Sequence, residues 1–306
     1  MSPAVPGAGP GKSTTGARRP VAVPPGGLRD RVARRPLTAF LVLVFGVGWP
    51  LLSVPALTAH GVLPGGPLPQ EPFALGTTLL VMLPAALWVT AVADGPGAVR
   101  GLLRRAVRWR FGAGWWAVVL LALPVLTLAA GQGLQTGDLL ATLGWGAFSV
   151  LTAVLLVHLW EETVWAGFFQ GRLEQRHGFL AAAALTAVPF AAVHLPLSFV
   201  GDLAIDRLAL AIGGLLVLGV LMRLLVGATV RGAAGSLLAA GIVHATFNAA
   251  NNEGNLVDDL LGGGQPSLYA VVAAALFTAG ALLAPRNRRR RRPRAAGSTS
   301  GATVRT

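Results

Sequence analysis

The chain contains no cysteine, and only 12% of its 306 residues are charged. About a quarter of the residues in an ordinary soluble domain are charged, so that class is excluded. The absence of cysteine excludes a disulfide-stapled secreted domain, a thiol protease and a cysteine-ligated zinc or iron–sulfur site. Hydrophobic residues make up 54% of the chain, and the formal net charge is +13. Such a charge would suggest a nucleic-acid partner in a soluble protein, but the apolar content argues against one here.

Composition divides the chain into three parts. Residues 1–36 are rich in proline, glycine, serine and arginine, and we predict a disordered basic leader because such a segment buries too little apolar surface to offset its ordering entropy. Residues 285–306 carry a dense run of arginines, and we predict a disordered cytoplasmic tail. Residues 37–284 are nearly continuous hydrophobic sequence, which we predict to be a transmembrane helical domain.

A membrane-spanning helix needs about 20 mostly apolar residues. Eight segments reach or approach this length: 37–57, 73–93, 113–130, 139–160, 179–195, 205–226, 232–250 and 267–284. We therefore predict an all-α, multi-pass protein of the cell membrane with about eight transmembrane helices. If both termini are cytoplasmic, every basic residue except Arg207 lies on the cytoplasmic side, including Arg223, in agreement with the excess of basic residues in short cytoplasmic loops.

The basic residues have two interpretations. In the first they set the topology and nothing more. In the second, residues 98–110 (AVRGLLRRAVRWR) form an amphipathic interfacial helix that binds anionic lipid together with the arginine tail. We expect no nucleic-acid partner, because aromatic residues make up only 7% of the chain and no phosphate-binding loop motif occurs.

A few polar residues interrupt the apolar segments. Glu161 and Glu162 lie between LTAVLLVHLW and TVWAGFFQGRL, His194 ends FLAAAALTAVPFAAVH, and His244 and Asn248 share one helix face in GSLLAAGIVHATFNAA. Acidic residues inside a membrane are costly and mark functional sites by default. The alternative to a functional site is purely structural. In that case the two glutamates mark the end of the fourth span, and each histidine only packs between helices.

The spacing predicts that these side chains converge. Residues 177–178 lie midway between Glu161 and His194, so an antiparallel helical hairpin that turns there brings both to the same depth, with roughly 24 Å of helix on either side. His244 approaches a similar depth in the seventh span. The hairpin requires the fourth helix to continue to about Arg176, and therefore to start later than the span count suggests or to tilt.

Such a cluster suits hydrolysis of an acyl bond. A buried carboxylate and an imidazole can together deprotonate a water, and a second histidine with an asparagine amide can donate to the oxyanion of a tetrahedral intermediate. This chemistry requires no cofactor. A zinc site is a further possibility, with Glu161, His194 and His244 as ligands, because a catalytic zinc needs only three protein ligands.

Three motifs resemble the CPBP family of intramembrane proteases, the CAAX-processing and bacteriocin-processing or abortive-infection proteins. They are EETVWAG at 161–167, FAAVH at 190–194 and HATFN at 244–248, and the resemblance covers about residues 140–250. It implies an eight-helix membrane fold and an endopeptidase that cleaves a membrane-embedded peptide or a lipidated protein.

The resemblance also implies a role for each matching residue. Glu161 corresponds to the catalytic carboxylate and His194 to the partner that helps it to activate water. Glu162 corresponds to the supporting acid. His244 and Asn248 correspond to residues that bind the oxyanion or, in the metalloprotease interpretation, take part in a metal site.

One position departs from the family pattern E-E-x-x-x-R, because Ala166 stands where the arginine belongs. A buried arginine would offset the charge of the two glutamates. Without it we expect Glu162 to be protonated or bonded to another group, and His158, four residues earlier on the same face, is a candidate. An inactive or weakly active homologue that serves as a membrane binding or immunity protein is therefore the alternative to an active protease. A proton-relaying transporter is disfavoured because no inverted repeat with broken helices is found.

Overall fold

The computed structural model describes residues 26–130, 139–201, 205–251 and 267–283, and every regular element in these ranges is a helix. The α-helices are α1 (Leu28–Arg34), α2 (Pro36–Leu43), α3 (Trp49–Ala59), α4 (Glu71–Gly76), α5 (Leu83–Asp94), α6 (Pro96–Ala106), α7 (Ala113–Ala130), α8 (Leu139–Ala153), α9 (Leu159–Glu162), α10 (Gly171–His177), α11 (Phe179–His194), α12 (Ile205–Gly232), α13 (Leu237–Asn251) and α15 (Ser267–Leu283). Wider π-helical segments are η1 (Val44–Gly48), η2 (Thr77–Met82), η3 (Val154–His158) and η4 (Thr163–Gln170), and η5 (Leu195–Phe199) is a 3-10 helix.

The predicted all-α membrane fold is confirmed. Five helical runs within the described ranges are long and apolar enough to cross a membrane by length and composition: Pro36–Ala59, Glu71–Asp94, Leu139–His177, Phe179–Phe199 and Leu208–Gly232. The three other predicted segments coincide with the shorter helices α7, α13 and α15. The number of eight spans and the cytoplasmic placement of both termini remain predictions.

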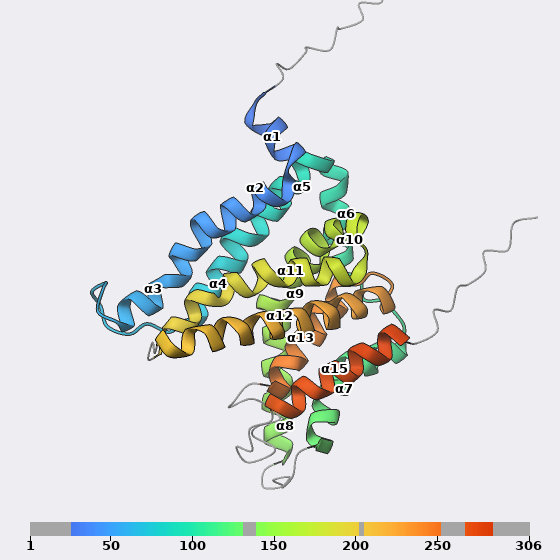
Figure 1. Cartoon of the computed structure of the whole chain (residues 1–306). Helices are drawn as coiled ribbons and strands as arrows, with labels where there is room; N and C mark the ends of the chain where they lie inside the picture. The colour runs from blue at the N-terminus through green and yellow to red at the C-terminus, as the bar shows by residue number, and fades with distance from the viewer. Residues whose placement is uncertain (1–25, 131–138, 202–204, 252–266, 284–306) are drawn as a thin grey trace, which may run out of the picture.

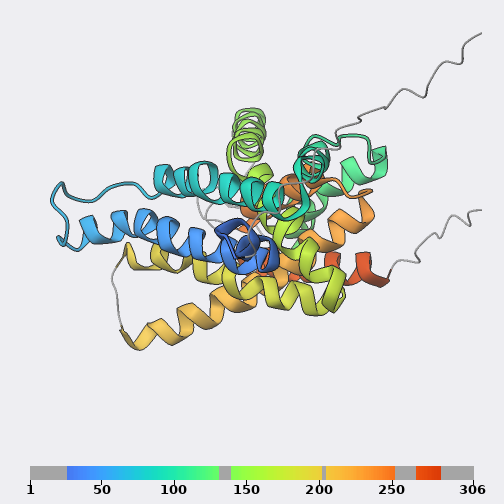
Figure 2. The same ribbon diagram turned by 90° about the horizontal axis from the view of Figure 1, so that it is seen from above.

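The helices pack side by side in several groups (Figure 1). The run α2–α3 lies beside α4–α5, α11 lies along α12, and α7 packs against α13 and α15. Helix α8 stands apart from the others when the molecule is viewed from above (Figure 2), and its Leu140 and Trp145 are exposed. The core lies where α9 and η4 are enclosed by α11, α12 and α13.

The predicted hairpin is present. The helical run from Leu139 continues to His177, and Gly178, with φ of +73°, turns the chain directly into α11. Of the two alternatives that we expected for the fourth helix, a start later than Leu139 is excluded, and a tilt of the helix remains a prediction. Its 39 residues extend about 58 Å at 1.5 Å per residue, nearly twice the thickness of a bilayer core, so only part of this run can cross it at once.

The predicted boundary of the leader is also wrong. Residues 1–25 and the predicted tail at 285–306 lie outside the described residues, but Leu28–Arg34 form α1, which packs on α5. Burial of Val32 supplies the apolar contact that the composition of the leader did not suggest. Pro36 begins α2, where a proline costs no helical hydrogen bond.

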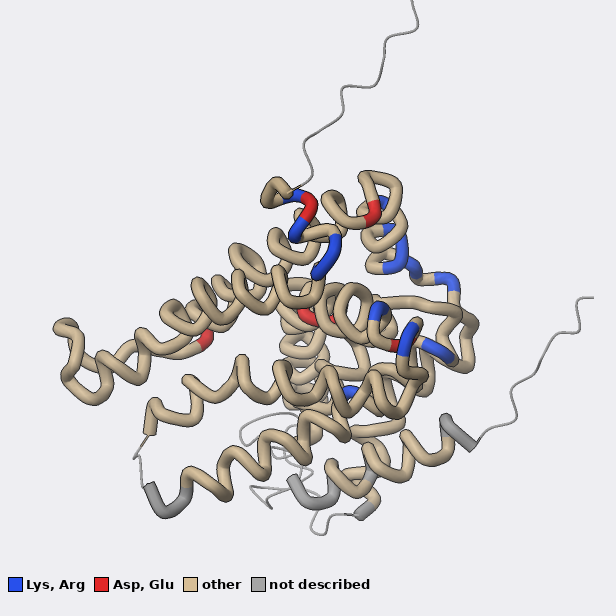
Figure 3. The backbone as a smooth tube through the Cα atoms, turned by 45° about the horizontal axis from the view of Figure 1, so that its top comes forward, with Lys and Arg blue, Asp and Glu red and all other residues tan. Residues whose placement is uncertain are grey.

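The charged residues are unevenly distributed. In the described part of the chain, the arginines gather at one end of the molecule, around α1, α6 and α10 (Figure 3). Helix α6 occupies most of the predicted amphipathic segment at 98–110, with Leu102 buried and Arg104 exposed. Arg223, which we counted among the cytoplasmic basic residues, is 0% exposed and lies inside the helical core.

Candidate active site

The side chains singled out in the sequence meet where α9, α11, α12 and α13 pack together. Helix α9 carries Glu161 and Glu162 and lies between η3 and η4. Segments of π-helix inside a longer helix occur frequently at functional sites. Successive residues on a helix point about 100° apart, so the two carboxylates face different partners.

Glu162 is fully buried and accepts three hydrogen bonds. Its Oε2 accepts from Arg223 Nη1 at 2.9 Å, and its Oε1 accepts from Arg223 Nη2 at 2.7 Å and from His244 Nδ1 at 2.7 Å. The Arg223 guanidinium also lies over the ring of Phe190, with Cζ 4.1 Å from its centroid. A bidentate pair of this kind fixes the orientation of both side chains.

Arg223 therefore balances the negative charge of Glu162. The family pattern would place an arginine at position 166 for this purpose, where this chain has Ala166. The expectation that His158 is the partner of Glu162 is wrong, because the imidazole of His158 contacts Glu161 instead. Arg223 lies on α12, 61 residues from Glu162, and no local motif could connect the two. The available signal was an arginine within the apolar run GGLLVLGVLMRLLVGATV, where a charge is costly without a partner.

Glu161 faces three histidines. Its Oε2 accepts a hydrogen bond from His158 Nδ1 at 3.2 Å and lies 3.9 Å from His244 Nδ1. Its Oε1 lies 4.0 Å from His194 Nε2. His194 Nδ1 donates to the carbonyl oxygen of Phe190 at 2.7 Å, so a neutral His194 presents the lone pair of Nε2 to Glu161.

Asn248 contacts Glu161 only through His158. The Asn248 amide donates to His158 Nε2 at 3.3 Å, which leaves the proton of a neutral His158 on Nδ1, where it is donated to Glu161. The rings of His158 and His244 stack with centroids 4.2 Å apart. All five predicted site residues thus lie in one network, to which the structure adds His158 and Arg223.

The site also contains a set of ligands that suits a metal ion. His158, Glu161 and His244 are buried and each offers one ligand atom, all within 4.8 Å of one another. His194, which we predicted as a ligand, is not part of this group, and His158 takes its place. Two imidazoles and a carboxylate form a donor set that zinc accepts, and zinc bound there would supply a Lewis acid that acidifies a water.

Gly241 sets the distance between α13 and α9. A Cβ atom at this position would lie 2.9 Å from both the backbone nitrogen and the Cα of Leu159. These are backbone atoms, so the contact cannot be relieved by a rotamer change. The close approach holds His244, three residues further along α13, against Glu162.

We expect Gly241→Ala to lower the catalytic rate because α13 must move away from α9. A displacement of about 1 Å at reacting groups costs as much as about 100-fold in rate. Peptide hydrolysis by the purified variant checks this prediction. Gly213→Ala on α12 is the control, since its Cβ would meet nothing within 4 Å, and this substitution should leave the rate unchanged. Equal rates for both variants would contradict the structural role of Gly241.

Comparison with known proteins agrees with the motifs. Residues 143–250 match the family model described as type II CAAX prenyl endopeptidase Rce1-like, and this range contains all seven residues of the site described above. No curated protein and no solved structure matched the chain. Residues 143–250 are therefore similar to Rce1-like domains of the CPBP family, the family that the three motifs resemble.

Proposed function

We propose that this protein is an intramembrane endopeptidase of the cell membrane that hydrolyses a peptide bond in a lipidated or membrane-embedded peptide. The observation that carries the proposal is the pair formed by Glu161 and His194. Their facing atoms lie 4.0 Å apart, which is too long for a direct hydrogen bond and suits one water that bonds to both.

In the proposed reaction this water is the nucleophile. As its oxygen forms a bond to the carbonyl carbon of the substrate, its proton passes to the Glu161 carboxylate, and His194 orients it through Nε2. The carbonyl oxygen gains the negative charge of the tetrahedral intermediate. When the C–N bond breaks, the proton held by Glu161 passes to the leaving nitrogen, and the products are a carboxylic acid and an amine.

The remaining residues position the catalytic groups and stabilise the oxyanion. The second N–H of the Asn248 amide supplies a hydrogen-bond donor for the oxyanion. His244, whose Nδ1 donates to Glu162, supplies a second donor from Nε2 when it is an imidazolium. Arg223 is a positioning residue, because it fixes Glu162, which in turn fixes the orientation of His244. His158 holds the Glu161 carboxylate in place. In this arrangement hydrogen bonds fix the orientation of these side chains before the substrate binds.

The test uses a peptide with a prenylated cysteine three residues from its C-terminus, the substrate type named by the family model. With wild-type protein in proteoliposomes, mass spectrometry should detect one cut, after the prenylated cysteine. The same peptide without the lipid should be cut at least about tenfold more slowly, because the lipid places the peptide in the membrane. Release of no product from either peptide by the folded protein would contradict the proposal and favour a binding or immunity role.

A further inference from the structure

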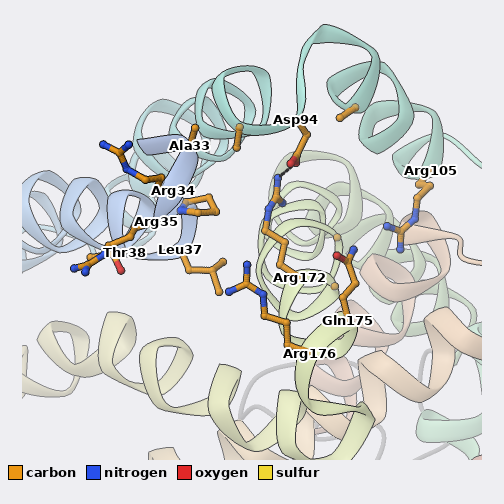
Figure 4. Close-up of a pocket in the computed structure, with 15 residues that line it drawn as sticks. Ala33, Arg34, Arg35, Leu37, Thr38, Asp94, Arg105, Arg172, Gln175 and Arg176 are labelled. Carbon is orange, nitrogen blue, oxygen red and sulfur yellow. Dashed lines mark hydrogen bonds and ion pairs between the residues drawn. The ribbon is translucent and has the colours of Figure 1, made fainter. Parts of the chain in front are cut away.

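A cavity lies at the basic end of the molecule, and its lining contains none of the residues of the site around Glu161. Its volume is about 750 Å³, which is within the range of small-molecule sites. The junction of α1 and α2, the ends of α5 and α6 and the helix α10 enclose it (Figure 4). Its charged lining residues are Arg34, Arg35, Arg105, Arg172, Arg176 and Asp94.

The charge of this cavity is incompletely balanced. Arg172 forms a salt bridge with Asp94 and donates to the Thr90 hydroxyl at 3.3 Å, which satisfies the one acidic residue of the lining. Within the described part of the chain, the four other arginines form no salt bridge. Burial and the nearby Arg108 lower the pKa of Arg105, because both disfavour its charged form. An anion beside the guanidinium would stabilise that charged form.

The cavity lies at the level where two candidate spans end. Pro36–Ala59 starts at its lining residues, and Glu71–Asp94 finishes there. Helices leave the hydrocarbon at this level, where the phosphate groups of a bilayer lie. Figure 4 shows Arg172 and Arg176 rising into the cavity from α10, while Arg105 approaches from α6.

Two apolar grooves continue from the cavity. The first has a volume of about 310 Å³ and shares Arg35 and Thr38 with the cavity. The second, of about 390 Å³, shares Leu43 and Trp88 with the first and follows η1 and η2. Leu80, which lines the second groove, is 76% exposed, so the groove faces outward. A basic cavity joined to apolar grooves matches a molecule with an anionic head and a hydrocarbon tail.

We propose that this is a binding site for an anionic phospholipid, whose phosphate lies among the arginines and whose acyl chain follows the grooves along α2. The net positive lining favours a headgroup with net negative charge over a zwitterionic one. The grooves favour a lipid over free phosphate or the carboxylate of a peptide, neither of which has a tail to bury. This site is distinct from the proposed peptidase site and does not depend on its activity.

The test titrates the purified full-length chain in detergent micelles with phosphatidylglycerol or phosphatidylcholine of identical acyl chains, and native mass spectrometry reads the bound lipid. We expect tighter binding of phosphatidylglycerol. The double variant Arg35→Gln/Arg176→Gln should weaken its binding by about 25-fold, since each basic residue near a membrane surface contributes about fivefold in affinity.

Arg100→Gln/Arg104→Gln is the matched control, because both residues are exposed and lie outside the cavity lining while the net charge falls equally. Its affinity should stay within about twofold of the wild type. An equal loss in the two double variants would overturn the site and leave only diffuse attraction. Competition by inorganic phosphate as strong as by the long-chain lipid would overturn the lipid assignment, and so would displacement by a peptide acid but not by its amide.

Discussion

Replacing Glu161 by glutamine is expected to reduce hydrolysis of the prenylated peptide by about 100-fold to 10⁴-fold, the range that general acid–base catalysis contributes. The amide keeps the size of the side chain and its hydrogen bond with His158 but cannot accept the proton of the attacking water. The rate of product formation by the purified variant in proteoliposomes measures the loss.

The matched control is Glu71→Gln at the start of α4, an exposed acid far from the site. This variant should retain the wild-type rate. Both variants should show the same thermal unfolding transition as the wild type to within a few degrees, so that a loss of rate reports chemistry. Wild-type turnover by Glu161→Gln would remove Glu161 from the mechanism.

Replacing Arg223 by methionine is expected to lower the free energy of unfolding by about 3–5 kcal/mol, because Glu162 would be left buried without its charged partner. Hydrolysis should fall as well, since Glu162 holds His244. Thermal unfolding of the protein in detergent measures the first effect. Arg231→Met on the same helix removes an exposed arginine, and its effect should stay near about 0.5 kcal/mol.

Ala166→Arg added to Arg223→Met tests what Arg223 does. Position 166 lies one helical turn beyond Glu162, so an arginine there can reach the same carboxylate from η4. We expect the double variant to recover much of the lost stability together with kcat, at an unchanged KM. Recovery of neither would show that Arg223 acts through its packing against Phe190 rather than through its charge.

The spacing of polar residues predicted the convergence of the site correctly because it depends on local geometry. One helix-breaking glycine, Gly178, sets the turn of the hairpin, and the rise per residue then brings Glu161 and His194 to one level. The long apolar segments likewise predicted the helical elements, since hydrophobicity over some 20 residues requires no knowledge of tertiary contacts.

The sequence could not reveal what depends on contacts between distant helices. The pairing of Arg223 with Glu162 follows from how distant helices pack, and counting basic residues by loop could not show that Arg223 is buried in the helical core. The presence of His158 in place of His194 in the metal-ligand group depends on how the helices pack, since His194 Nε2 lies 4.0 Å from Glu161 Oε1 while His158 Nδ1 lies 3.2 Å from Oε2. The short helix α1 escaped prediction because its burial of Val32 is a tertiary contact.

The central claim is that Arg223 keeps this site competent although Ala166 occupies the position of the motif arginine. The measurement that tests it most directly is the turnover of the prenylated peptide by purified wild-type protein, with Glu161→Gln in parallel. We predict a single cut by the wild type and at least about a 100-fold lower rate for the variant. A folded wild-type protein that releases no product would contradict the claim.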